Sequence, residues 1–321
     1  MIMKTRILST LFFAAFSLAA LAGVNPGSDD ARFNGDRCYG FGDYETAVKY
    51  YERAVDLDEM NVRALTRLGS MYKRGLGVKR NYKTALNYYM KAAATGDGNA
   101  IFNVGTFFLA GQGVKANTNE AMRWFELASE KGCADAEYQM GCLYFTGTGV
   151  PLDYNMALEW YKKAAEHRYL SALVNIGYMC CNGLGVVKDA AIGVQWYLHA
   201  AKYGSAEAMR NLGFCYSAGE GVDVDEAEGL EWYQKAATLG DRPSIDYLRS
   251  IGKYISVEEQ YEEIPLVIGE DDVDEEIEGG VPMQVQGAEM EADDEFGDFH
   301  DDDDETDNPA YLEDMPNIPQ K

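Results

Sequence analysis

An alanine returns every 36 residues along the middle of this chain, and a glycine follows each of these alanines five residues later. The five pairs are Ala64 and Gly69, Ala100 and Gly105, Ala136 and Gly141, Ala172 and Gly177, and Ala208 and Gly213. A fixed period of this length is typical of solenoids, in which each unit buries its apolar face only by stacking on its neighbours. The period therefore predicts a row of like units.

Each unit carries two helical patterns separated by a glycine-rich turn. In the unit 62–97, one helical spacing runs to Tyr72, and a second begins at Ala85 and stops at Gly96. A phosphate-binding loop is not expected, because the third glycine of G-x-G-x-x-G is missing and no strand precedes the turn. We assign the turn glycines a structural role only: Gly75, Gly77, Gly111, Gly113, Gly147, Gly149, Gly183, Gly185, Gly219 and Gly221.

The full pattern, A-x3-L-G-x2-Y-x2-G-x-G-V-x2-D-x2-K-A-x2-W-Y-x-K-A-A-x2-G, resembles the Sel-one-like repeat, a relative of the tetratricopeptide repeat. Five copies cover 62–243. Residues 23–61 have a different spacing and resemble one ordinary tetratricopeptide repeat, and 244–256 continue only the first helical spacing, which suits a capping helix. The resemblance implies an all-α fold, a right-handed solenoid superhelix of helix-turn-helix repeats that is used for protein-protein contact.

By the same resemblance, the first helix of each repeat lines a concave groove. The groove positions are basic in the first repeat and apolar or aromatic in the later ones, and exposed aromatic side chains favour capture of a protein or peptide. The alternative, that part of them packs against neighbouring helices, stays open. The candidate partner-binding residues are Arg63, Lys73, Arg74, Phe102, Thr106, Tyr138, Phe145, Tyr178 and Phe214.

The N-terminus has the pattern of a secretory signal. Lys4 and Arg6 precede an apolar run over 7–21, and Ala22 ends a small-x-small cleavage pattern. We therefore expect 1–22 to be a signal peptide and the mature chain to be periplasmic or secreted, without lipid attachment or membrane insertion. A membrane anchor is the alternative, although the run is too short to span a bilayer comfortably.

The last part of the chain, 257–321, carries nearly all of the formal net charge of −25. Between Glu258 and Asp314 lie 25 acidic residues and no Lys or Arg, and this composition predicts a disordered acidic tail. A calcium loop is not expected, because Ile277 stands where the loop needs glycine. Apolar residues in the tail, Tyr311 among them, leave a binding motif open.

Charge also varies between repeats. Residues 62–97 carry a net charge of +7, whereas 208–243 carry −4. We therefore expect a weak, salt-dependent intramolecular contact between the acidic tail and the basic first repeat. Nucleic acid is not an expected partner, because predicted export and the acidic tail both oppose it.

Residues suited to catalysis are few. The three histidines have no nucleophile placed beside them by the pattern, and the six cysteines neither follow the repeat period nor form a C-x2-C pair. No catalytic residue, metal or cofactor is predicted, and the disulfide pattern stays open. The sequence predicts an exported, non-catalytic scaffold or adaptor for a protein or peptide. The alternatives are a secreted effector that acts on a host protein and a hydrolase of the kind suspected for some exported cysteine-rich relatives.

Overall fold

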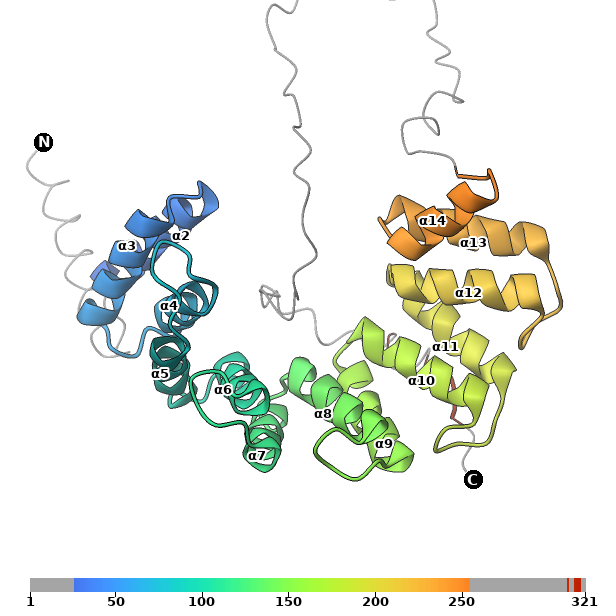
Figure 1. Ribbon diagram of the computed structural model, residues 1–321, viewed down its shortest axis with the longest axis horizontal. Coiled ribbons are helices and arrows are strands. Elements are labelled where there is room, and N and C mark those ends of the chain that lie inside the picture. The colour runs from blue at the N-terminus through green and yellow to red at the C-terminus, as the bar shows by residue number, and fades with distance from the viewer. Residues whose placement is uncertain (1–25, 255–310, 312–314, 319–321) are drawn as a thin grey trace, which may run out of the picture. The chain divides into compact units, whose positions relative to one another are not determined.

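The structure, a computed structural model, describes residues 26–254, 311 and 315–318, so the expected signal peptide and most of the acidic tail lie outside it. Its described part is all-α, with thirteen helices and no strand (Figure 1). The helices are α2 (Pro26–Gly40), α3 (Tyr44–Leu57), α4 (Val62–Arg74), α5 (Tyr82–Ala93), α6 (Gly98–Ala110), α7 (Thr118–Ser129), α8 (Ala134–Thr146), α9 (Tyr154–Glu166), α10 (Leu170–Asn182), α11 (Ala190–Lys202), α12 (Ala206–Ala218), α13 (Glu226–Thr238) and α14 (Arg242–Ser250).

The chain divides into two compact units. The first contains α2 to α10, and the second, 189–318, contains α11 to α14 with the described residues of the C-terminal segment. In the first unit, α2 packs on α3, α4 on α5, α6 on α7 and α8 on α9, and consecutive pairs join where α5 meets α6 and α7 meets α8. α6 also contacts α8, so the first helices of these pairs share one layer (Figure 1). This is the helix-turn-helix stacking that the period predicts.

Local sequence explains where the helices begin and end. The second helix of each full repeat starts after an Asn or Asp whose side chain accepts a hydrogen bond from a backbone N–H of the first turn, as Asn81 does for Thr84. The first helix ends at a left-handed glycine, Gly75 in the first full repeat, where a side chain would be strained. All ten turn glycines have φ between 65° and 78°.

The cores of five helix pairs are built on a contact between a helical glycine and an aromatic ring. A Cβ placed on Gly141 of α8 would lie 2.5 Å from Cδ1 and Cε1 of Tyr161 on α9, so only glycine lets these helices approach so closely. The same contact recurs between Gly105 and Phe125, and Gly35 and Tyr51 extend it to the first pair despite its different spacing. Small residues opposite rings give each pair an interlocking core.

Candidate partner-binding surface

The first helices carry all the residues that the sequence proposes for partner binding. α4 holds the basic residues, α6 and α8 hold Phe102, Thr106, Tyr138 and Phe145, α10 holds Tyr178, and α12 holds Phe214. The first four of these helices belong to the first unit and α12 to the second.

The basic part of this surface lies at the first full repeat. Arg63 and Arg74 are exposed and Lys73 is half-buried. The guanidinium of Arg74 donates to the hydroxyl of Tyr39 over 3.5 Å, and Arg67 lies 5.2 Å from the centroid of the same ring. Exposed positive charges at both ends of this helix attract acidic groups in a partner. The tail carboxylates expected to contact this repeat lie outside the described residues, so that contact stays a prediction.

An aromatic cluster occupies the third repeat and the start of the fourth, and we define it as Tyr138, Phe145, Tyr161, Tyr169 and Tyr178. The ring of Tyr138 stacks on that of Tyr169 with 4.6 Å between centroids. Phe145 contacts Tyr161 and meets Tyr178 edge-on at 6.3 Å. Burial raises the pKa of the Tyr161 and Tyr169 hydroxyls, so both stay protonated. The cluster therefore runs from buried rings to Tyr178, which is 47% exposed.

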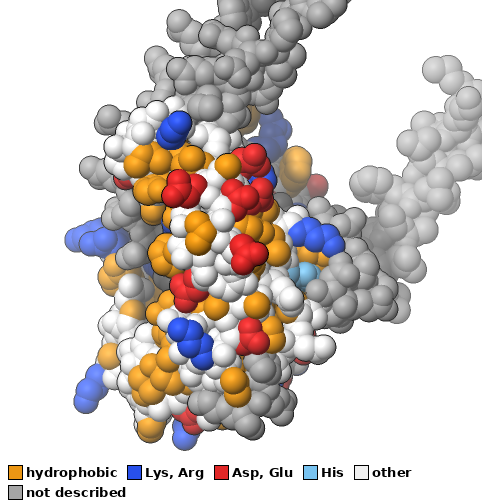
Figure 2. Space-filling view, turned by 90° about the vertical axis from the view of Figure 1, so that its right-hand side faces the viewer, with side chains coloured by type: hydrophobic (Ala, Val, Ile, Leu, Met, Phe, Trp, Pro, Cys, Tyr) orange, Lys and Arg blue, Asp and Glu red, His pale blue; other side chains and the backbone are white. Residues whose placement is uncertain are grey.

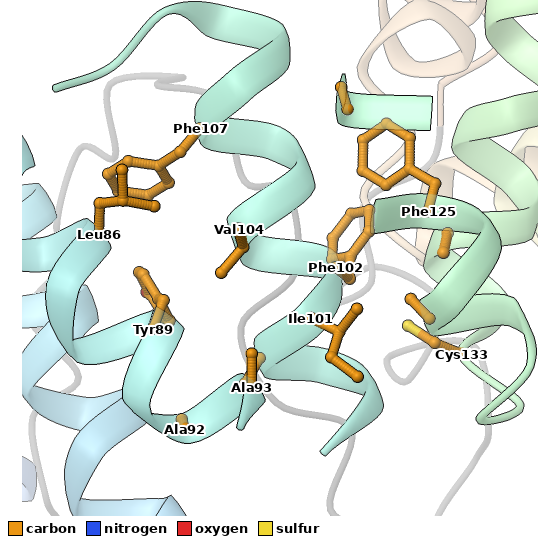
Figure 3. Packing of buried hydrophobic residues seen from close by; sticks show 14 of the residues in the cluster. Leu86, Tyr89, Ala92, Ala93, Ile101, Phe102, Val104, Phe107, Phe125 and Cys133 are labelled. Carbon is orange, nitrogen blue, oxygen red and sulfur yellow. The ribbon is translucent and has the colours of Figure 1, made fainter. Parts of the chain in front are cut away.

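Two of the proposed residues are engaged inside the protein. Phe102 is only 6% exposed, and Figure 3 shows its ring directed at Phe125 of α7, with 5.6 Å between the centroids. It belongs to the core and does not offer the exposed ring expected of a groove residue. The hydroxyl of Thr106 is half-buried and donates to the backbone carbonyl of Asn103 over 2.7 Å, so its own helix uses its donor.

In the second unit, Phe214 is 53% exposed and places an apolar ring on the surface of α12. Figure 2 shows the side of the molecule on which α11 to α14 lie. Asp and Glu side chains are interspersed there among hydrophobic ones. This fits the net charge of −4 over 208–243. Phe214 therefore lies in a repeat of net negative charge.

A polar cluster that the sequence reasoning missed lies between α7, α8 and the end of α9. Glu137 is 3% exposed and occupies a position where the other repeats hold apolar residues such as Leu173. The hydroxyl of Ser129 donates to Oε1 of Glu137 over 2.9 Å, and Nε2 of His167 lies 3.8 Å from Oε2. Burial raises the pKa of the Glu137 carboxyl. A glutamate at an apolar position of the repeat was the signal available in the sequence.

This cluster borders a depression of about 570 Å³ that is also lined by Trp160 and Lys163. The Glu137 carboxylate lies between the Ser129 hydroxyl and the His167 imidazole. A serine hydrolase needs the imidazole next to the serine, where it takes the serine proton, so this arrangement is not that of a catalytic triad.

Among the described residues, no group of three His, Cys, Asp or Glu side chains is placed to hold a metal ion. Cys38, Cys133 and Cys142 are free thiols. No helix in the described ranges is both long enough and apolar enough to cross a membrane.

Comparison with known proteins identifies the repeats. The family model of the Sel1 repeat matches 16–59, 62–97, 98–133, 134–169, 170–205 and 206–241. It thus covers the five 36-residue copies and also the first pair, whose spacing resembles a tetratricopeptide repeat. A comparison with curated proteins gave no match.

Two solved structures are similar to the chain in both sequence and fold. One is a Sel1 repeat protein from Oxalobacter formigenes, which is 37% identical with a TM-score of 0.62, over 71% of this chain and 95% of that one. The other is c5321, a protective antigen present in uropathogenic Escherichia coli strains that displays an SLR fold, 32% identical with a TM-score of 0.60. That match covers 74% of this chain and only 52% of c5321, so this chain spans about half of that protein.

Proposed function

This chain belongs to the Sel1 repeat family, and from that premise we propose that it is an exported, non-catalytic scaffold that binds a protein or peptide on the first helices of its repeats. Members of the family are generally scaffolds for protein-protein interaction. Export rests on the pattern of 1–22. The surface proposed for binding comprises the basic residues of α4 and the aromatic cluster with its exposed Tyr178.

The observation that carries the proposal is the support beneath Tyr178. Its ring is 47% exposed and rests edge-on against Phe145, which itself contacts the buried ring of Tyr161. A ring held by rigid neighbours loses little conformational entropy on binding, and tyrosine and arginine are enriched among residues that dominate binding energy. The basic residues of α4 favour acidic groups in the partner. The proposed ligand is therefore a segment with both apolar and acidic side chains.

A peptide-display selection against the full chain tests this surface. Tyr178→Ala should weaken binding of the selected peptides by about 1–3 kcal/mol, which corresponds to roughly 5- to 150-fold in Kd, while the midpoint of urea unfolding changes little. Phe41→Ala is the matched control, because Phe41 is an aromatic residue 83% exposed in the turn between α2 and α3. Unchanged affinity of Tyr178→Ala, or an equal loss in Phe41→Ala, would place the binding surface elsewhere.

A further inference from the structure

The helix α11 differs from the equivalent helices of the neighbouring repeats at one position. Three residues after the tryptophan of the second helix, repeats three and five have a lysine, and repeat four has His199. The ammonium nitrogen of Lys163 lies 3.8 Å from the centroid of Trp160, and that of Lys235 lies 4.0 Å from the centroid of Trp232. In those two repeats the chain covers its own tryptophan with a cation.

In repeat four a tyrosine from the C-terminal segment lies at this place. Tyr311 is 1% exposed, and its ring centroid is 5.1 Å from that of His199 and 4.9 Å from that of Tyr203. His199 in turn meets Trp196 edge-on at 6.5 Å. We call Trp196, His199 and Tyr203 the α11 aromatic site.

Burial at the α11 aromatic site differs from burial at the equivalent residues. Lys163 and Lys235 are exposed and their tryptophans are half-buried, whereas His199 is 6% exposed and Trp196 is buried. A lysine chain keeps its charged end in water, but an imidazole on a helix surface leaves a flat, partly apolar face that another ring covers well. The replacement of lysine by histidine therefore creates a surface for a ring.

We propose that the α11 aromatic site is a peptide-docking site and that Tyr311 of the chain's own C-terminal segment is its resident ligand. The described residues 315–318 belong to the same compact unit as α11, and three of these four are half-buried. Lys202 places its ammonium nitrogen 5.7 Å from the Tyr203 centroid, beside the site. Glu313 and Asp314 follow Tyr311 in the sequence.

Attachment to the same chain explains why one buried ring is enough to hold the segment. Residues 255–310 link Tyr311 to the end of the repeats, so docking is intramolecular, with an effective concentration on the order of a millimolar or less. A contact whose Kd for a separate peptide lies well below a millimolar is then largely occupied within the chain. Docking of Tyr311 keeps competing aromatic peptides from the site.

Fluorescence anisotropy with a labelled synthetic peptide of residues 308–321 tests the proposal on full-length protein. Tyr311→Ala vacates the site, so this variant should bind the peptide at least tenfold more tightly than the wild type does. Phe299→Ala removes another ring from the tail and is the matched control, which should bind like the wild type. A second peptide with alanine in place of Tyr311 should not bind any of the chains.

The reverse change tests the site itself. In Tyr311→Ala/His199→Lys, the new lysine should cover Trp196 as Lys163 covers Trp160, and the peptide should bind at least tenfold more weakly than to Tyr311→Ala. Equal binding to wild type and Tyr311→Ala, or no binding to Tyr311→Ala, overturns the proposal. Because a variant at buried His199 can lose its fold, hydrogen exchange over 196–203 gives a second measurement. Exchange there should be faster in Tyr311→Ala than in wild type and Phe299→Ala, and equal rates in all three overturn the proposal.

Sedimentation equilibrium distinguishes docking within one chain from docking on a second copy. Wild type and Tyr311→Ala should have the same molecular mass over the whole concentration range. A dimer of the wild type that Tyr311→Ala abolishes would mean that the segment docks on another molecule, and this result would overturn the intramolecular assignment.

Discussion

Two junctions in the first unit use the same positions of the repeat and differ in chemistry. Where α7 meets α8, the hydroxyl of Ser129 donates to the buried carboxylate of Glu137 over 2.9 Å. Where α9 meets α10, the equivalent positions hold Ala165 and Leu173, and both are buried. One junction is closed by a polar pair, and the other by apolar side chains alone.

The repeat period determines where a side chain lies in the fold. It does not determine the free energy of burying that side chain. Burying a carboxylate is unfavourable unless its oxygens are well paired. Oε1 of Glu137 accepts a hydrogen bond from Ser129, and Oε2 lies 3.8 Å from Nε2 of His167. Burial of the apolar Leu173 side chain, by contrast, stabilises the fold. Because the stability of such arrays sums over units and neighbour interfaces, we expect the α7–α8 junction to be the weaker of the two.

Helices α8 and α9 form the pair that joins the two junctions, and Gly141→Leu disrupts this pair with the largest expected effect. A side chain there meets the ring of Tyr161, since even a Cβ would lie 2.5 Å from it. We expect the free energy of unfolding to fall by about 3 kcal/mol. Urea denaturation measures this loss, and hydrogen exchange should show that α8 and α9 lose protection together.

Gly40→Leu is the control for that change, because nothing lies within 4 Å of a Cβ placed at Gly40. It should alter the free energy of unfolding by less than about 0.5 kcal/mol. If Gly141→Leu lowers the free energy of unfolding no more than Gly40→Leu does, the glycine-ring contact does not hold α8 and α9 together. The two junctions would then not be linked by a rigid helix pair.

The second change converts one junction into the other. Ser129→Ala/Glu137→Leu gives the α7–α8 junction the residues of the α9–α10 junction, and we expect it to raise the free energy of unfolding by about 1–2 kcal/mol at neutral pH. Ser129→Ala alone should have the opposite sign, since it removes the hydrogen-bond donor from a buried carboxylate. Urea midpoints of the three proteins measure both effects. A double variant less stable than the wild type would mean that the polar pair stabilises its junction.

The smallest effect is the pH dependence of that difference. Burial raises the pKa of Glu137 in the folded chain, the hydrogen bond from Ser129 together with His167 and Lys163 lowers it, and Glu166 raises it slightly. The stability linked to this raised pKa is therefore fully present below the pKa of an unfolded glutamate, about 4.3, and is lost as pH rises through the folded value. The advantage of the double variant should grow between about pH 4 and pH 7 in urea titrations. An advantage that is constant over this range would contradict the raised pKa.

The helices and turns were predictable from sequence because their causes are local and repeat. Glycines such as Gly75 and Gly77 mark the turns, and an Asn or Asp begins each second helix of the full repeats. The facing of the aromatic residues was harder to predict. Two residues after the periodic alanine, Phe102 is buried, whereas six residues after it Tyr178 is exposed. The outcome depends on the ring that the partner helix supplies, such as Phe125 opposite Phe102.

The C-terminal contact had no periodic signal at all. Tyr311 lies in an acidic segment whose composition predicts disorder, and its partners His199 and Tyr203 lie more than a hundred residues earlier. Composition averages over a segment and cannot single out one ring that finds a complementary surface. The only trace in the sequence was the histidine in a position where repeats three and five have lysine.

The uniform turns also govern how a chain of this kind changes length over generations. Each full repeat closes its first helix with the same left-handed glycine and opens its second helix with the same kind of cap. A duplication or deletion that begins and ends at equivalent points of two turns therefore joins backbone of the same conformation. An insertion or deletion of another length would separate the glycine that ends the first helix from the Asn or Asp that begins the second. A block that keeps the turns in phase is 36 residues long, and a local novelty such as His199 or Glu137 would be copied or lost together with its whole block.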